Sequence, residues 1–186
     1  SDRILDRRPE LRDMHRQAGL DLVNLLGLEG GYAEGIQVTE SLAERYPDEA
    51  ADWRRDLAML RLAKGESAAG LAELEALALE KPDDVWNWIV LANESRIEGK
   101  FAEASSALER ALDAAAAADP EVLADVHLQR FQLLKDRGHV DDAVAAGELA
   151  LEANADVAEG VHEVYAMLTD SGRYADAMDY VERDAN

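Results

Sequence analysis

The side chains that most often carry out chemistry are few in this chain and far apart. The four histidines form neither an HxxxH nor an HExxH pair, so a zinc site would need ligands from separate segments: His15, His127, His139 and His162. We expect His127 to pack between helices and His139 to lie in a turn. There is no cysteine, which excludes disulfides and thiolate metal sites. We therefore predict neither a metal site nor a cofactor.

Two pairs of adjacent acids, Asp83–Asp84 and Asp141–Asp142, could indicate carboxylate chemistry or a calcium site. No DxDxDG loop accompanies them, and each pair lies where a helix is expected to begin, so helix capping explains them better. The glycines form neither GxGxxG nor a loop ending in GK[ST], and no GxSxG nucleophile is present. The sequence therefore predicts a protein that is not an enzyme.

The glycines follow a regular period instead. Five short strings align, each beginning with a glycine and carrying a small residue five positions later. Successive leading glycines are 35, 34, 39 and 34 residues apart. The leading glycines are Gly30, Gly65, Gly99, Gly138 and Gly172, and the small residues are Gly35, Gly70, Ala104, Ala143 and Ala177.

This period predicts pairs of helices. Each leading glycine is expected to end a helix, because a positive φ costs little without a Cβ atom. Each small residue should let the next helix approach the preceding one closely. Prolines are expected at the connections, at Pro47, Pro82 and Pro120. Hydrophobic residues make up 48% of the chain and aromatic ones only 5%, so alanine and leucine must form most of an all-α core.

The pattern resembles the tetratricopeptide repeat, a helix–turn–helix unit of about 34 residues. The third repeat matches best, with residue types that the family reserves for these positions at Trp88, Leu91, Ala92, Gly99, Phe101, Ala104, Leu108 and Ala111. The resemblance implies an all-α fold, a right-handed α-solenoid of stacked antiparallel helix pairs.

The resemblance also implies the organisation of the chain. We expect residues 1–15 to be an N-terminal helical extension or the remnant of a preceding repeat. About five repeats should follow, at 16–50, 51–84, 85–123, 124–157 and 158–186. The interval from Gly99 to Gly138 exceeds the period by five residues, which lie in LDAAAAADPE (112–121). We expect the second helix of the third repeat to be about one turn longer.

Solenoids of this family bind partners on a concave face lined by the first helix of each repeat. The alignment predicts the partner-binding residues Asn24, Arg55, Met59, Trp86, Ile89, Asn93, Arg96, Gln132 and Lys135, with Leu20 and Leu28 on the same face. The amides could bond a peptide backbone, the cations suit a carboxylate, and the apolar side chains could anchor a partner. Alternatively, these are ordinary surface residues whose cations are neutralised by neighbours such as Asp52 and Asp136.

Some members of the family clamp the C-terminal carboxylate of chaperones with lysine, asparagine and arginine at fixed positions. Asn24 fits one of these positions. Leu20, Trp86 and Val90 stand where the clamp needs basic residues. We therefore do not expect that specificity here.

The formal net charge is -21, which repels phosphate backbones and anionic lipids, so we predict binding to neither nucleic acid nor membrane. The predicted function is a non-catalytic scaffold for a protein or peptide. Two alternatives stay open: an acidic chaperone or carrier for a basic client, and a regulatory domain of a larger enzyme. Self-association through the terminal repeats is also possible. We expect a cytoplasmic location, with the periplasm as the alternative.

Overall fold

The computed structural model describes residues 8–115, 119–154 and 158–178, and in these ranges the regular structure is entirely helical. The chain forms two compact units, Ser1–Glu80 and Lys81–Asn186, which we call the first and the second unit. Within the described residues, no helix combines the length and the apolar character that crossing a bilayer would require.

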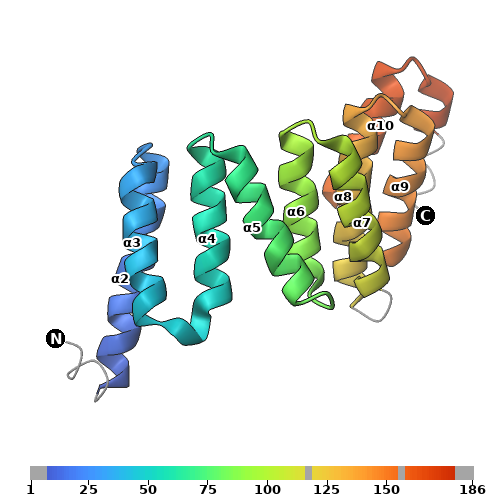
Figure 1. Cartoon of the computed structure of the whole chain (residues 1–186). Coiled ribbons are helices and arrows are strands. Elements are labelled where there is room, and N and C mark those ends of the chain that lie inside the picture. The colour runs from blue at the N-terminus through green and yellow to red at the C-terminus, as the bar shows by residue number, and fades with distance from the viewer. Residues whose placement is uncertain (1–7, 116–118, 155–157, 179–186) are drawn as a thin grey trace. The chain divides into compact units, whose positions relative to one another are not determined.

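The first unit contains consecutive antiparallel helices (Figure 1). They are α2 (Pro9–Leu28), α3 (Tyr32–Arg45), the short 3-10 helix η1 (Pro47–Glu49), α4 (Ala50–Ala63) and α5 (Ser67–Glu80). Within this unit, α2 packs against α3, α3 against α4, and α4 against α5. The core shared by α2, α3 and α4 is made of Val23, Leu42, Tyr46, Trp53 and Leu60. The indole Nε1 of Trp53 donates a hydrogen bond of 3.2 Å to the carbonyl oxygen of Tyr46, which satisfies this buried donor.

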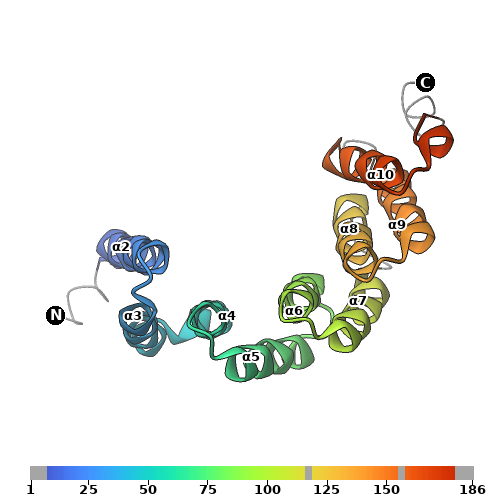
Figure 2. The same cartoon turned by 90° about the horizontal axis from the view of Figure 1, so that it is seen from above.

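The second unit is also built from consecutive helices, and these form two layers. Its helices are α6 (Val85–Ile97), α7 (Phe101–Ala115), α8 (Pro120–Asp136), α9 (Val140–Ala153) and α10 (Ala158–Asp170), and residues 174–178 are also helical. Within this unit, α6, α8 and α10 form one layer, and α7 and α9 form the other (Figure 2). Phe131, Val164 and Leu168 are buried at the centre of the part built by α8, α9 and α10.

The glycine period marks the helix ends, as predicted. All five leading glycines have a positive φ, between 72° and 89°. At Gly99 the backbone N–H donates to the carbonyl of Arg96 at 2.9 Å, and the N–H of Lys100 donates to the carbonyl of Ser95 at 2.8 Å. These two bonds satisfy the last carbonyls of α6 and form the usual glycine-ended helix terminus.

The small residues lie where neighbouring helices approach most closely. Ala104, Ala143 and Ala177 are buried, as are Gly35 and Gly70. At Gly70 the structure confirms the close approach that the sequence predicted, because a Cβ atom there would come within 2.9 Å of the carbonyl oxygen of Ala58 on the preceding helix.

The long interval between Gly99 and Gly138 is only partly explained by the described residues. As described, α7 has 15 residues against 14 in α5, and α8 has 17 residues against 14 in α4. Much of the extra length that the structure describes is therefore in α8, the helix after the one that we expected to lengthen. Any continuation of α7 into 116–118 lies outside the described residues.

At the N-terminus, α2 runs without a break from Pro9 to Leu28. The boundary expected between residues 15 and 16 therefore falls inside one helix. The segment from Pro9 to His15 is helical and continuous with the first helix of the expected first repeat, and residues 1–7 lie outside the described residues.

Candidate partner-binding surfaces

The histidines and paired acids lie in structural positions. His127 is buried on α8, and His139 lies in the connection before α9, as predicted. Asp84 caps α6, since its carboxylate accepts a hydrogen bond of 3.2 Å from the backbone N–H of Trp86. Asp141 and Asp142 lie in the first turn of α9, where negative charge is favourable to the helix dipole. No three His, Asp or Glu side chains gather as metal ligands within the ranges described above.

The first unit contains an open apolar cleft between α2 and α4, with a volume of about 590 Å³. We call it the α2–α4 cleft. Its lining residues are Leu20, Val23, Asn24, Gly27, Leu28, Tyr32, Asp56, Met59, Leu60 and Ala63. Asn24 and Met59, both predicted as partner-binding residues, lie on it. Leu20 and Leu28, expected on the same face, lie on it too.

Helical spacing explains why these side chains meet. Leu20, Asn24 and Leu28 are four residues apart, so they follow one face of α2. Asp56, Met59 and Ala63 are spaced by three and four residues on α4 in the same way. Two of the apolar residues on the cleft remain in contact with solvent: Leu28 is 87% exposed and Met59 is 38% exposed. The cleft therefore presents apolar surface that the first unit does not cover.

Asp56 is the one charged residue among those that line the cleft. Burial raises the pKa of its carboxyl group above the ordinary value, and repulsion from Asp52 raises it further, while Arg55 opposes the rise. Asp56 was not among the residues predicted from the alignment. Its position three residues before Met59 on a helix could have revealed it.

Arg55 does not line the cleft. Its guanidinium lies 3.6 Å from the carboxylate of Asp52, one turn earlier on α4. Asp52 is one of the acids that the sequence suggested as a neutralising neighbour, so Arg55 has the expected acid beside it, and its role in partner binding stays a prediction.

In the second unit, the predicted polar residues join successive helices of one layer. Arg96 of α6 forms an ion pair with Asp136 at the end of α8. Arg96 also donates a hydrogen bond of 3.0 Å to the amide oxygen of Asn93, and Asn93 donates one of 3.1 Å to Glu94. Asp136 is thus the acid beside Arg96, as the sequence suggested, and the role of Arg96 in partner binding stays a prediction.

The same arrangement recurs between α8 and α10. The ammonium group of Lys135 lies 3.0 Å from the carboxylate of Glu163, and the amide of Gln132 donates to that carboxylate. We call the two sets of contacts together the polar bridges of the second unit. The charged and amide groups that form these contacts therefore already have partners within the protein, whereas Nε of Arg96 is buried without one among the described residues.

The two apolar residues predicted on α6 differ in exposure. Trp86 is 50% exposed near the start of the helix. Ile89 is only 6% exposed, and it belongs to the buried side of α6 with Val85, Trp88 and Ala92. Ile89 therefore has almost no exposed surface with which to anchor a partner.

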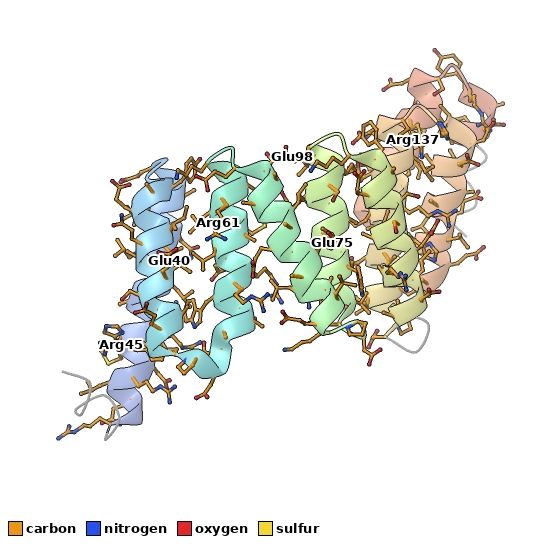
Figure 3. The ribbon with its side chains drawn as sticks, in the orientation of Figure 1. Glu40, Arg45, Arg61, Glu75, Glu98 and Arg137 are labelled. Atoms are coloured by element: carbon orange, nitrogen blue, oxygen red, sulfur yellow. The ribbon has the colours of Figure 1, made fainter. Side chains whose placement is uncertain are left out.

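Charged side chains of both signs cover the surface of each unit. Figure 3 shows Glu40 of α3 and Arg61 of α4 in the first unit, and Glu98 and Arg137 at helix ends of the second. Both units therefore carry basic side chains on their surfaces, although acidic residues outnumber basic ones in the chain.

No protein-family model and no curated protein matches the sequence. Solved structures do match it. One is BtubC (BKLC) from P. vanneervenii, with 18% identity, a TM-score of 0.77, and coverage of 98% of this chain and 83% of that one. Another is TTC0263, a thermophilic TPR protein of Thermus thermophilus, with 22% identity, a TM-score of 0.63, and coverage of 91% and 89%. A third is MamA, with 14% identity, a TM-score of 0.63, and coverage of 91% and 89%.

These similarities extend over most of the chain and include a TPR protein. The chain therefore has the tetratricopeptide repeat fold that its glycine period predicted. At these identities the comparison establishes the fold alone.

Proposed function

We propose that this chain is a non-catalytic scaffold that binds a segment of another protein, and that the α2–α4 cleft holds this segment. The observation that carries the proposal is the exposed apolar lining of the cleft. The tetratricopeptide repeat fold supports it, because repeat proteins of this kind typically use such surfaces to mediate protein–protein interactions.

The dimensions and lining of the cleft suit a peptide side chain. A volume of about 590 Å³ is in the range of ordinary ligand pockets, roughly 300 to 1,000 Å³. Leu28 and Met59 offer apolar contact, and methionine adapts to differently shaped partners. The Asn24 amide carries both a donor and an acceptor, which suits an extended peptide backbone.

The second unit is a weaker candidate for the primary contact. A partner that bound Arg96, Lys135 or Gln132 through the same groups would have to displace Asp136 or Glu163. Exposed surface pairs of this kind contribute little, about 1 kcal/mol or less, so they could be exchanged without unfolding the unit. Trp86 is the residue of this unit that we propose as an additional apolar contact.

A random peptide display library tests the proposal. Peptides should be selected on the wild-type chain, and their affinities then measured by fluorescence anisotropy on Met59→Gln and Met14→Gln. Met14 is exposed on α2 and does not line the cleft, so it is a matched control. We expect Met59→Gln to weaken selected peptides about tenfold, the loss of roughly 1.4 kcal/mol of contact, and Met14→Gln to leave them unchanged. A library without binders, or binders indifferent to Met59, would refute the proposal.

A further inference from the structure

The α2–α4 cleft combines an apolar wall with a single carboxylate. Leu20, Leu28 and Met59 supply apolar surface from two helices, and Asp56 lies among them. Among the described residues, no hydrogen bond from another side chain is seen at Asp56. The guanidinium of its neighbour Arg55 lies 3.6 Å from the carboxylate of Asp52, and its positive charge also acts on Asp56, where it opposes the rise in pKa.

The carboxylate of Asp56 is only partly solvated, because the protein around it buries part of the side chain. Burial is the largest cause of its raised pKa, and the second cause is repulsion from Asp52. Removing more water from it would cost more free energy, unless the arriving group brings a positive charge or a hydrogen-bond donor. A purely apolar side chain would bury the charge without a partner, and an acidic one would be repelled.

A basic side chain fits both features of the cleft. Lysine and arginine carry a flexible aliphatic stem that packs on apolar surface and a charged end that seeks a carboxylate. We propose that the α2–α4 cleft binds a lysine or arginine side chain of the partner segment, with the stem against Leu28 and Met59 and the cation paired with Asp56. This inference rests on the function proposed above and adds the class of side chain that the site selects.

The charge of the whole chain favours the same partner. A net charge of -21 raises the local concentration of a basic segment and speeds its association, and salt screens this long-range effect. The contact with Asp56 is different in kind, since a partly desolvated pair is screened less than exposed charges. The pairing should therefore remain detectable at an ionic strength that removes general attraction.

The experiment uses the peptides selected on the wild-type chain, at about 0.15 M salt, where the Debye length is short. In each peptide the basic residue is replaced by an uncharged analogue of similar length, norleucine for lysine or citrulline for arginine. Binding is measured on wild type and on Asp56→Asn, which is nearly isosteric. Asp13→Asn is the matched control, because it makes the same change of charge at an exposed position of α2 away from the cleft.

We expect lysine or arginine to be enriched at one peptide position. Compared with the original peptide, the peptide that carries the uncharged analogue should bind wild type and Asp13→Asn at least tenfold more weakly. It should bind Asp56→Asn less than twofold more weakly than the original peptide does. If peptides depend on Met59 but not on their basic residue, the inference is wrong and the proposed function stands. An equal loss in all three proteins would also overturn it, since the charge would then act over the surface as a whole. If no peptide depends on Met59, both proposals fail.

Discussion

Gly70 lies against Leu62 in a contact that leaves no room for a side chain. A Cβ atom on Gly70 would come within 2.6 Å of Cγ of Leu62 and 2.9 Å of the carbonyl oxygen of Ala58. The first turn of α5 therefore packs directly on the last turns of α4, and this contact sets how closely the two helices of the repeat approach.

Replacing Gly70 by alanine should destabilise the protein by about 1–3 kcal/mol, because backbone must move to admit the methyl group. Gly27 on α2 is the matched control, since a Cβ atom there would meet nothing within 4 Å. Gly27→Ala should instead stabilise the protein by about 0.5–1 kcal/mol, through the helix propensity of alanine. Urea unfolding followed by circular dichroism measures both changes, and equal effects at the two positions would contradict the assigned packing.

Ala104→Arg should destabilise the second unit by on the order of several kcal/mol. Ala104 is fully buried in the first turn of α7, so arginine would both overpack the site and bury a charge. Ala102→Arg, two residues earlier on the exposed side of the same helix, should change stability by less than about 0.5 kcal/mol. A thermal melt that does not separate the two variants would mean that the helix register is wrong.

Asp56→Asn should stabilise the folded protein at neutral pH. The folded-state pKa of Asp56 is raised, so the unfolded chain holds the charged form more easily, and ionisation opposes folding above that pKa. The destabilisation of the folded state by the ionised carboxylate is complete above the folded-state pKa. It vanishes as the pH falls towards the unfolded-state pKa. The stability difference between Asp56→Asn and wild type should therefore shrink as the pH is lowered from about 7.5 towards the unfolded-state pKa of an aspartate, about 3.9. Asp13→Asn, at an exposed position, is the control for the change of charge. If Asp56→Asn is stabilised as expected, weaker binding of basic peptides by this variant could not be attributed to unfolding.

His127 should make the second unit less stable as the pH falls. Burial on α8 lowers the pKa of its imidazole, and Arg130 lowers it further, so the folded protein holds the neutral form. Its stabilising effect is complete above the unfolded-state pKa, about 6.5, and is lost as the pH falls through the lower folded-state value. Unfolding of His127→Gln between about pH 7.5 and about pH 5.5 should depend less on pH than that of wild type. His162→Gln, on an exposed position of α10, is the control for the loss of a histidine.

The pair formed by Arg96 and Asp136 should couple α6 to α8 by about 0.5–1 kcal/mol. Both side chains remain partly exposed, which limits the strength of their interaction. A double-mutant cycle with Arg96→Ala and Asp136→Ala isolates this coupling, and it should decrease in about 1 M salt. A coupling of zero at low salt would show that the contact does not stabilise the unit.

What could be read from the sequence depended on how local each feature is. The positive φ at Gly99 and the cap at Asp84 are properties of a few neighbouring residues, so residue type and spacing were enough to predict them. The burial of the small residues was also predictable, because their regular period places each one at the equivalent position of its own helix pair. Asn24 and Met59 were placed on one surface for the same reason, through their shared position in successive repeats.

Tertiary structure decided which of the aligned residues could meet a partner. Helical spacing assigns a residue to a face, but how far that face lies from the next helix depends on packing between segments distant in sequence. Only this packing buries Ile89, pairs Arg96 with Asp136, and leaves Asp56 beside the apolar wall of a cleft. The sequence by itself therefore determined the repeating helix pairs and their ends, whereas the cleft and its carboxylate exist only because α2 and α4 meet in the folded unit.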